Sequence, residues 1–305
     1  MIELKGLLLA ITTPFKDDLS LDVEGFGRLV EQSIDDGMQG LVVAGCTGEP
    51  WALNETERKS LFEIAVKRNK GRVPIVGGAS GIDAKEAIAR VRLAEAAGCD
   101  AVMVHAPWYV VPGPEELFDY FKEVVDASKL PVMIYNIPRR LGVGLSVDLV
   151  DRLADEEKVV ALKESSKDWM VLSEMIRRCK DRMNVLVGYA DTLGLGGIAE
   201  GSAGTVDAVF PALMGRTYRK FIDAALAGDM ATARPLQADF AKWHREMWGI
   251  GTFPAALKAA INMIGRAGGR PRPPLRPLNA QQSEQVRKVL TNMGLLSAGA
   301  ARRAG

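Results

Sequence analysis

Eight short apolar runs, rich in Val, Ile and Leu, recur along this sequence, and longer amphipathic segments separate most of them. Near-continuous apolar strands that alternate with helices are typical of a parallel sheet covered on its faces. The runs begin near Leu7, Leu41, Val73, Ala101, Val132, Val159, Val185 and Thr205. Eight units of roughly 25 to 33 residues each match a (β/α)8 TIM barrel, which is the fold that we predict.

The segments between the runs have the spacing of helices that bury one face. Helices are expected over 23–34, 56–68, 84–96 and 115–127, with Gly37 and Gly98 as C-caps of the first and third. A doubly wound open sheet is the structural alternative, but no GxGxxG motif follows the first run. The pattern therefore favours the barrel.

After the eighth run the pattern becomes wholly helical. Helices are expected over 218–227, 231–248, 255–264 and 281–293, with a connection rich in Gly, Arg and Pro over 266–277. We therefore expect the barrel over residues 1–215 and a C-terminal helical extension packed on it over residues 216–305.

Composition and charge exclude several classes of protein. The chain has 305 residues, 48% of them hydrophobic, and a formal net charge of +1, which gives no general field for nucleic acid. No apolar stretch reaches the length of a membrane span, and the first run is too short for a signal peptide. Three cysteines without a CxxC pair argue against a disulfide scaffold or structural zinc and favour a cytoplasmic location. His105 and His244 lie too far apart to form a histidine metal motif, and no metal site is expected.

The residues that close the apolar runs are unusually rich in reactive side chains. In barrels of this kind the active site lies at the carboxyl ends of the strands. The segments at those ends are TTP at 12–14, GCTGE at 45–49, GAS at 78–80, HAPWY at 105–109, YNIPRR at 135–140 and KES at 163–165. We expect one mouth of the barrel to collect a lysine, tyrosines, hydroxyls and arginines.

Lys163 stands alone in an apolar run, which makes it the first candidate for catalysis. Burial favours the neutral form of a lysine, and a neutral amine is the nucleophile of Schiff-base chemistry. The alternative is a lysine at the end of a strand that reaches solvent or pairs with Glu164. By our count Tyr135 ends the neighbouring strand, so its phenol would lie close enough to carry protons during imine formation.

The turn from Gly45 to Gly48 is a candidate carboxylate site. Its backbone N–H groups could form a nest for the anion, and Thr47 would add a hydroxyl donor. The alternative is that glycine is needed there only for steric reasons.

Three motifs together resemble the dihydrodipicolinate synthase / N-acetylneuraminate lyase family of class I aldolases. They are GCTGE at 45–49, YNIP at 135–138 and LKES at 162–165, in that order and at similar spacing, and the resemblance covers nearly the whole chain. It implies that Lys163 forms a Schiff base with pyruvate or another 2-oxo acid and that Tyr135 shuttles the proton. No cofactor is implied, because the imine itself acts as the electron sink.

The resemblance also implies roles for residues around the imine. Thr47 and the turn that includes Gly48 would bind the substrate carboxylate, and Val206 would line the same pocket. Tyr109 would complete the proton relay from a neighbouring subunit, which implies a homodimer or a homotetramer. Arg140 stands where the synthases keep an arginine for the second substrate, an aldehyde, and Arg139 is the alternative.

Two departures leave the substrate open. Cys46 replaces the first of two threonines in the synthase turn, and a thiol is a weak hydrogen-bond partner, so the relay would be interrupted or run through water. We interpret Cys46 as a small side chain that lines the substrate site rather than as a nucleophile. Asp191 and Asp207 could hold sugar hydroxyls, although either could be a helix cap or a loop residue.

Three functions follow from these observations. The resemblance favours a 4-hydroxy-tetrahydrodipicolinate synthase, a lyase that would condense pyruvate with aspartate semialdehyde. The second keeps Lys163 and makes the protein a 2-keto-3-deoxy sugar-acid aldolase or dehydratase. The third is a barrel that binds a phosphate ligand through Gly194 to Gly197 without imine chemistry, although those glycines would equally permit close helix packing.

Overall fold

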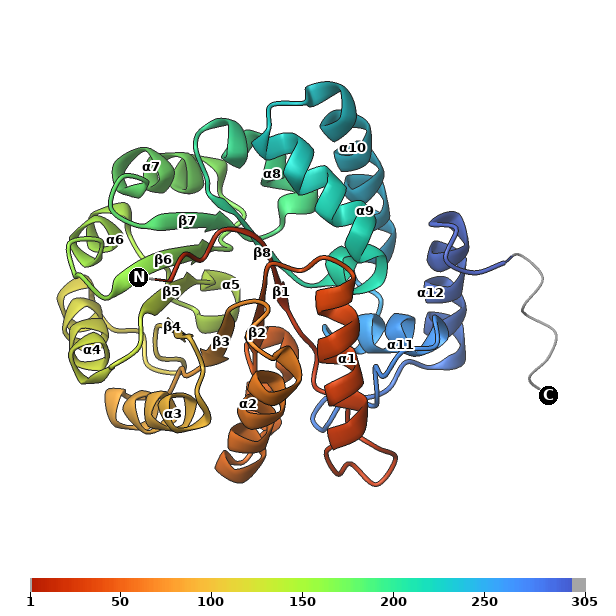
Figure 1. The fold of residues 1–305 in the computed structure, drawn as a ribbon, viewed down its shortest axis with the longest axis horizontal. Helices are drawn as coiled ribbons and strands as arrows, with labels where there is room; N and C mark the ends of the chain where they lie inside the picture. The colour runs from red at the N-terminus through yellow and green to blue at the C-terminus, as the bar shows by residue number, and fades with distance from the viewer. Residues whose placement is uncertain (1, 298–305) are drawn as a thin grey trace.

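Within residues 2–297, the part of the chain that this computed structural model describes, eight parallel strands close into a ring (Figure 1). Each strand pairs with the next along the chain, and the last pairs with the first. The strands are β1 (Gly6–Ala10), β2 (Gly40–Val43), β3 (Ile75–Gly78), β4 (Ala101–His105), β5 (Val132–Asn136), β6 (Val159–Glu164), β7 (Asn184–Val187) and β8 (Gly204–Asp207). The predicted (β/α)8 barrel is confirmed, and the open-sheet alternative is wrong.

Helices follow the strands and cover the outside of the ring (Figure 1). Local sequence sets their ends: Asn54 and Glu57 form a capping box at the start of the second helix, and Gly98 closes the third with a φ of 81°. The helices between strands are α1 (Val23–Asp35), α2 (Glu55–Asn69), α3 (Ala84–Ala97), α4 (Pro114–Ala127), α5 (Pro138–Leu141), α6 (Val147–Leu153), α7 (Trp169–Cys179) and α8 (Ala190–Ala199). Two 3-10 turns, η1 (Cys46–Gly48) and η2 (Pro50–Ala52), follow β2.

Up to residue 297, four further helices follow β8, as the sequence predicted. They are α9 (Val209–Leu226), α10 (Met230–Met247), α11 (Ala255–Met263) and α12 (Ala280–Asn292). The expected boundary between residues 215 and 216 falls inside α9, just after a break in its helical geometry at Met214. The division into a barrel and an extension stays a prediction, and residues 298–305 of that extension lie outside the described part of the chain.

An aromatic cluster packs α10 against α9, the helix that follows the last strand of the barrel. Phe210, Tyr218 and Phe221 of α9 are buried against Phe240 and Trp243 of α10, and the ring centroids of Tyr218 and Phe240 are 4.7 Å apart. Each such aromatic pair contributes about 0.5–1.5 kcal/mol beyond the area that it buries. The cluster therefore fixes where the C-terminal end of α10 lies.

No helix between residues 2 and 297 is both long enough and apolar enough to cross a bilayer.

Candidate active site

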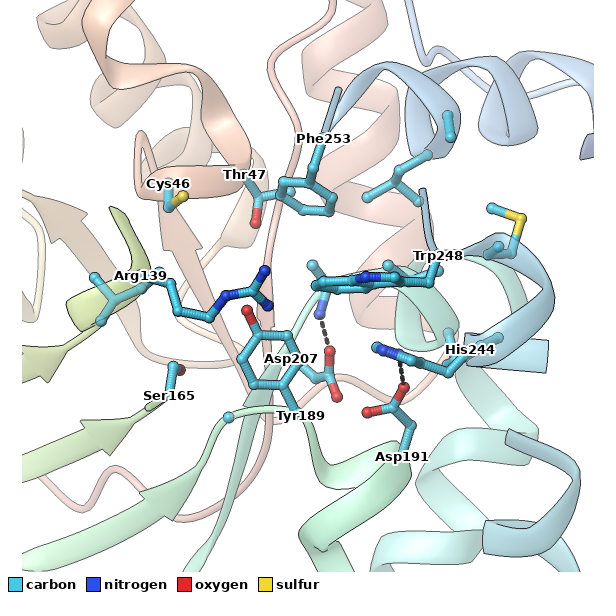
Figure 2. Close-up of a pocket in the computed structure, with 18 of the residues that line it drawn as sticks. Cys46, Thr47, Arg139, Ser165, Tyr189, Asp191, Asp207, His244, Trp248 and Phe253 are labelled. Carbon is cyan, nitrogen blue, oxygen red and sulfur yellow. Dashed lines mark hydrogen bonds and ion pairs between the residues drawn. The ribbon is translucent and has the colours of Figure 1, made fainter. Parts of the chain in front are cut away.

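A cavity of about 410 Å³ opens at the carboxyl ends of the strands, and both the barrel and the C-terminal helices line it. Figure 2 shows side chains from the two parts of the chain pointing into one space. From the barrel come Cys46, Thr47, Tyr135, Ile137, Arg139, Arg140, Lys163, Ser165, Gly188, Tyr189, Asp191, Val206 and Asp207. From the last third of the chain come, among others, His244, Met247, Trp248, Ile250, Phe253 and Leu257.

Lys163 faces this cavity from β6 and is only 6% exposed. Burial lowers the pKa of its amine to about 8, although the nearby Cys46 and Asp207 partly oppose the shift. Its neighbour Glu164 does not pair with it, because that carboxylate accepts hydrogen bonds from the Asn136 amide at 3.0 Å and the Ser166 N–H at 2.8 Å. Lys163 is thus a buried amine beside an open space.

Tyr135 lies next to Lys163 because the two residues are register partners on β5 and β6. The Nζ atom of Lys163 is 4.3 Å from the centroid of the Tyr135 ring. Tyr135 is 3% exposed, and burial raises the pKa of its phenol well above the usual value, with a further contribution from Cys46. The phenol therefore keeps its proton at neutral pH and is able to donate it.

The η1 turn brings Cys46 and Thr47 to the rim of the same cavity. Thr47 is 4% exposed, and the carbonyl of Gly48 accepts a hydrogen bond from the Thr13 hydroxyl at 2.8 Å. The N–H of Gly48 is bound to the carbonyl of Gly45 at 2.8 Å. Within this turn, the Thr47 hydroxyl and the N–H groups before Gly48 are therefore better placed than the Gly48 N–H to receive a ligand.

Six of the eight site residues expected from the sequence line this one cavity: Cys46, Thr47, Tyr135, Arg140, Lys163 and Val206. Gly48 is the last residue of the same η1 turn and is not among the residues that line the cavity. Tyr109 lies away from the cavity, on the loop between β4 and α4, where it is 93% exposed. A single chain therefore does not bring Tyr109 to Tyr135.

The two arginines after β5 both reach the cavity, and each lies over an aromatic ring. The guanidinium carbon of Arg139 is 5.0 Å from the Trp248 ring, and that of Arg140 is 5.7 Å from the Phe253 ring. Figure 2 shows Arg139 extending into the pocket. Because Trp248 and Phe253 follow α10, the C-terminal part of the chain sets where both cations lie.

Asp191 and Asp207, the two acids that the sequence analysis considered as ligands for sugar hydroxyls, have different surroundings. Asp207 accepts hydrogen bonds from the Tyr218 hydroxyl at 2.7 Å and the Ala208 N–H at 2.7 Å, so it stabilises the end of β8. Asp191 lies in the first turn of α8 and lines the cavity, and its Oδ2 atom contacts Nδ1 of His244. Asp191 is therefore not the N-cap of its helix.

Sequence reasoning missed the aromatic and histidine side chains of the outer wall, His244, Trp248 and Phe253. The only local sequence feature that marked this wall was WGIG at 248–251, where a tryptophan and two glycines break the helical pattern.

Gly194 and Gly197, which the sequence analysis considered as a phosphate-binding segment, lie buried inside α8. A Cβ atom on Gly197 would come within 2.6 Å of Val187, so close packing explains this glycine.

Comparison with known proteins gives a consistent result over nearly the whole chain. Residues 3–293 match the model of the dihydrodipicolinate synthetase family. A 4-hydroxy-tetrahydrodipicolinate synthase of Methanothrix thermoacetophila is 36% identical over 96% of this chain and 98% of its own length. The crystal structure of dihydrodipicolinate synthase from Aquifex aeolicus is 34% identical, with a TM-score of 0.91 over 96% of this chain and 99% of that one. A prophage protein of the dihydrodipicolinic acid synthase family from E. coli K12, solved in complex with pyruvate, is 29% identical, with a TM-score of 0.91 over 96% and 99% of the two chains.

Proposed function

This chain belongs to the dihydrodipicolinate synthetase family, whose members are lyases, and we propose that it is a Schiff-base-forming 4-hydroxy-tetrahydrodipicolinate synthase. It would condense pyruvate with aspartate semialdehyde. The observation that carries the proposal is the buried Lys163 amine, 4.3 Å from the Tyr135 ring at the edge of a cavity that opens to solvent. The names of the curated relatives support the choice of substrates.

In this proposal the Lys163 amine attacks the keto carbon of pyruvate. Water leaves, and a protonated imine forms between Nζ and that carbon. The cationic imine withdraws electrons from the neighbouring methyl carbon, which loses a proton to give an enamine, and this carbon then forms the new C–C bond with the aldehyde. Tyr135 transfers protons during these steps. The imine serves as the electron sink, so the proposed reaction uses no cofactor.

The substrate-binding roles are part of the same proposal. The Thr47 hydroxyl and the η1 turn, up to Gly48, would bind the pyruvate carboxylate, while Val206 limits the space around its methyl group. Arg140 would attract the carboxylate of the aldehyde from the pocket entrance. The position of these residues around one cavity supports the assignment.

The direct test gives the purified protein pyruvate with aspartate semialdehyde and then a panel of 2-keto-3-deoxy sugar acids. We expect turnover of the first pair. Asp191 favours a second candidate, a 2-keto-3-deoxy sugar-acid aldolase or dehydratase, since it presents a buried carboxylate to the cavity. Turnover of the sugar acids alone would replace the synthase assignment with this one.

The pH dependence of imine formation follows from the pKa of Lys163. The neutral amine is the nucleophile, and with a pKa of about 8 roughly a tenth of it is neutral at pH 7. We expect the rate of pyruvate capture to rise tenfold per pH unit below about pH 8 and to level off above it. Stopped-flow measurements between pH 6 and 10 would show this. A rate that still rises steeply at pH 9.5 would mean that the amine has the pKa of an exposed lysine.

Cys46 offers a test of the proton relay. Cys46 and Tyr135 line the same cavity, and Cys46 contributes to the raised pKa of the Tyr135 phenol, but a thiol is a poor hydrogen-bond partner. We expect Cys46→Thr to increase kcat by roughly three- to tenfold, because a hydroxyl would carry the proton directly. Cys46→Ser and Cys46→Ala serve as controls with and without a hydroxyl. A fall in kcat with both hydroxyl variants would show that the relay does not pass through this position.

We also propose that the enzyme is a homodimer or a homotetramer. The support is an exposed apolar segment in which Tyr109, Val110 and Val111 are 93%, 57% and 65% exposed. A second copy that covers this segment would bring its Tyr109 to the first copy's relay. Light scattering should give a dimer or larger for the parent and a monomer for Val111→Asp, whereas Tyr109→Phe should stay assembled but turn over more slowly. A parent protein that is monomeric at micromolar concentration would contradict this part of the proposal.

A cytoplasmic location is the last part of the proposal. It is supported by the cysteines, because Cys99 and Cys179 are buried as free thiols, which persist most readily in a reducing compartment. Cell fractionation with an antibody against the chain would test it.

A further inference from the structure

A second cavity, of about 530 Å³, lies between α1, the loop that precedes it and residues 262–270. Figure 1 places α1 beside α11, the helix in which this last segment begins. None of the residues that line it lines the cavity of Lys163. Its volume is that of a pocket for a metabolite-sized ligand rather than for a bare ion.

Four cationic side chains and two carboxylates line this second cavity: Lys16, Arg28, Arg266, Arg270, Asp17 and Asp22. Neither Lys16 nor Arg28 forms an ion pair with a carboxylate of residues 2–297. The guanidinium of Arg270 is 3.8 Å from the Asp17 carboxylate, which is 97% exposed, so this pair contributes little. Arg266 alone has a close carboxylate, at 2.7 Å. Three cations are therefore left for an anion, and a phosphate group presents three oxygens and a charge of about −1.5 to −2 at neutral pH.

The same cavity is lined by hydrogen-bond acceptors. Gln32 lines it from α1, and the buried Oε1 atom of this side chain has no hydrogen-bond partner within residues 2–297. Asp22 uses its Oδ1 atom to accept the Gly25 N–H at 2.9 Å, which leaves Oδ2 for a ligand. An unpaired buried acceptor is costly, and a ligand that supplies a donor removes that cost. Hydroxyl groups suit these acceptors, because the neighbouring cations would repel an ammonium group.

The second cavity shares a wall with the ion pair behind the η1 turn. Phe15 and Arg270 both line the cavity, and the Arg270 N–H donates to the Phe15 carbonyl at 2.9 Å. The carbonyl of Arg270 accepts a hydrogen bond from Nζ of Lys258 at 2.6 Å, and the same ammonium lies 2.5 Å from Oε1 of Glu49. Glu49 directly follows the η1 turn, which includes Thr47. The backbone of Arg270 therefore links the second cavity to the proposed carboxylate site.

We propose that the second cavity binds a small phosphorylated polyol and that its occupant increases the affinity for pyruvate. The phosphate contacts Lys16, Arg28 and Arg270, and a hydroxyl group donates to Oε1 of Gln32. The three cations repel one another, so a bound anion stabilises this position of Arg270 and, with it, the ion pair that holds the η1 turn. The effect on pyruvate rests on the proposed function, whereas the binding site does not.

Isothermal titration calorimetry with four compounds tests the binding site. They are glycerol 3-phosphate, glucose 6-phosphate, inorganic phosphate and glucose. We expect one site per chain, and the better polyol phosphate should bind about tenfold or more tightly than inorganic phosphate, because its hydroxyl groups find acceptors. Glucose should not bind at millimolar concentration. If neither polyol phosphate binds, the site is overturned, and if inorganic phosphate binds as tightly as they do, the polyol assignment is wrong.

Variants place the ligand in this cavity. Arg28→Glu reverses a charge on the exposed face of α1 and should weaken polyol phosphate binding about tenfold or more. Gln32→Leu should keep phosphate binding but lose the preference for the polyol phosphate. Arg234→Glu makes the same charge reversal at an exposed position of α10 and should bind like the parent. Parent-like affinity in Arg28→Glu would show that the ligand binds elsewhere, and a preference that survives Gln32→Leu would overturn the role of its amide.

The effect on pyruvate is measured in both directions. We expect the polyol phosphate to lower the pyruvate concentration for half-maximal borohydride trapping by roughly fivefold, and pyruvate to lower the Kd of the polyol phosphate by the same factor, because linkage is reciprocal. Arg28→Glu should lose both shifts, and Arg234→Glu should keep them. Binding that leaves the half-saturation concentration unchanged, or raises it, overturns the effect on pyruvate. Absence of trapping in the parent overturns the proposed function and this effect with it, while the titrations still decide the binding site.

Discussion

Lys163→Ala is expected to lose all covalent capture of pyruvate and to reduce turnover by roughly 10⁴-fold or more, because the covalent nucleophile is removed. Mass spectrometry after borohydride reduction in the presence of pyruvate measures the first effect, and a coupled assay measures the second. The parent should gain the mass of one reduced pyruvate adduct per chain, and the variant should gain none.

Two further variants make this result specific. Lys163→Arg keeps a positive charge in the cavity but cannot form the imine, so it should be as inactive as the alanine variant. Lys220→Ala removes an exposed lysine of α9 and should label and turn over like the parent. Adduct formation on Lys163→Ala would show that another amine is the nucleophile and would remove the basis of the mechanism.

Lys258→Met is expected to destabilise the protein by about 3–5 kcal/mol, because it leaves a buried carboxylate without its partner. Lys258 of α11 and Glu49 of the turn after β2 are both fully buried, and Nζ lies 2.5 Å from Oε1. The same ammonium donates to the carbonyls of Thr13 at 2.8 Å and Arg270 at 2.6 Å. Urea unfolding followed by circular dichroism would measure the loss.

This ion pair also positions the proposed carboxylate site. Glu49 directly follows the η1 turn, has a left-handed φ of 55°, and accepts the Arg272 N–H at 2.9 Å through its other oxygen. We therefore expect Lys258→Met to raise KM for pyruvate more than it lowers kcat, because the Thr47 hydroxyl and the N–H groups of the turn would no longer be held in place.

Two comparisons test the argument for the buried pair. The double variant Glu49→Leu, Lys258→Met removes both charges and should recover much of the stability, but not the low KM. Lys59→Met disrupts an exposed pair with Glu63 at 2.6 Å and should cost less than about 1 kcal/mol. A Lys258→Met protein as stable as the parent would show that the pair does not hold the turn.

The sequence alone was enough to predict the barrel and the position of Tyr135 and Lys163 side by side at one end of it. Both depend on local burial: apolar runs and amphipathic segments show which stretches become buried strands and covering helices. Once the strands are counted, the closed parallel ring makes Tyr135 and Lys163 neighbours, and the structure pairs them in register. The GCTGE motif likewise predicted that Cys46 and Thr47 lie at the strand ends, where the cavity opens.

The outer wall of the site was decided only by the tertiary structure. His244 reaches Asp191, and Lys258 reaches Glu49, across 53 and 209 residues of sequence, which no periodic pattern connects. These contacts depend on how the helices after β8 fold back over the barrel mouth, and that is set by the aromatic packing between α9 and α10. Local sequence patterns report whether a residue is buried, but the partner that it meets depends on the path of the whole chain.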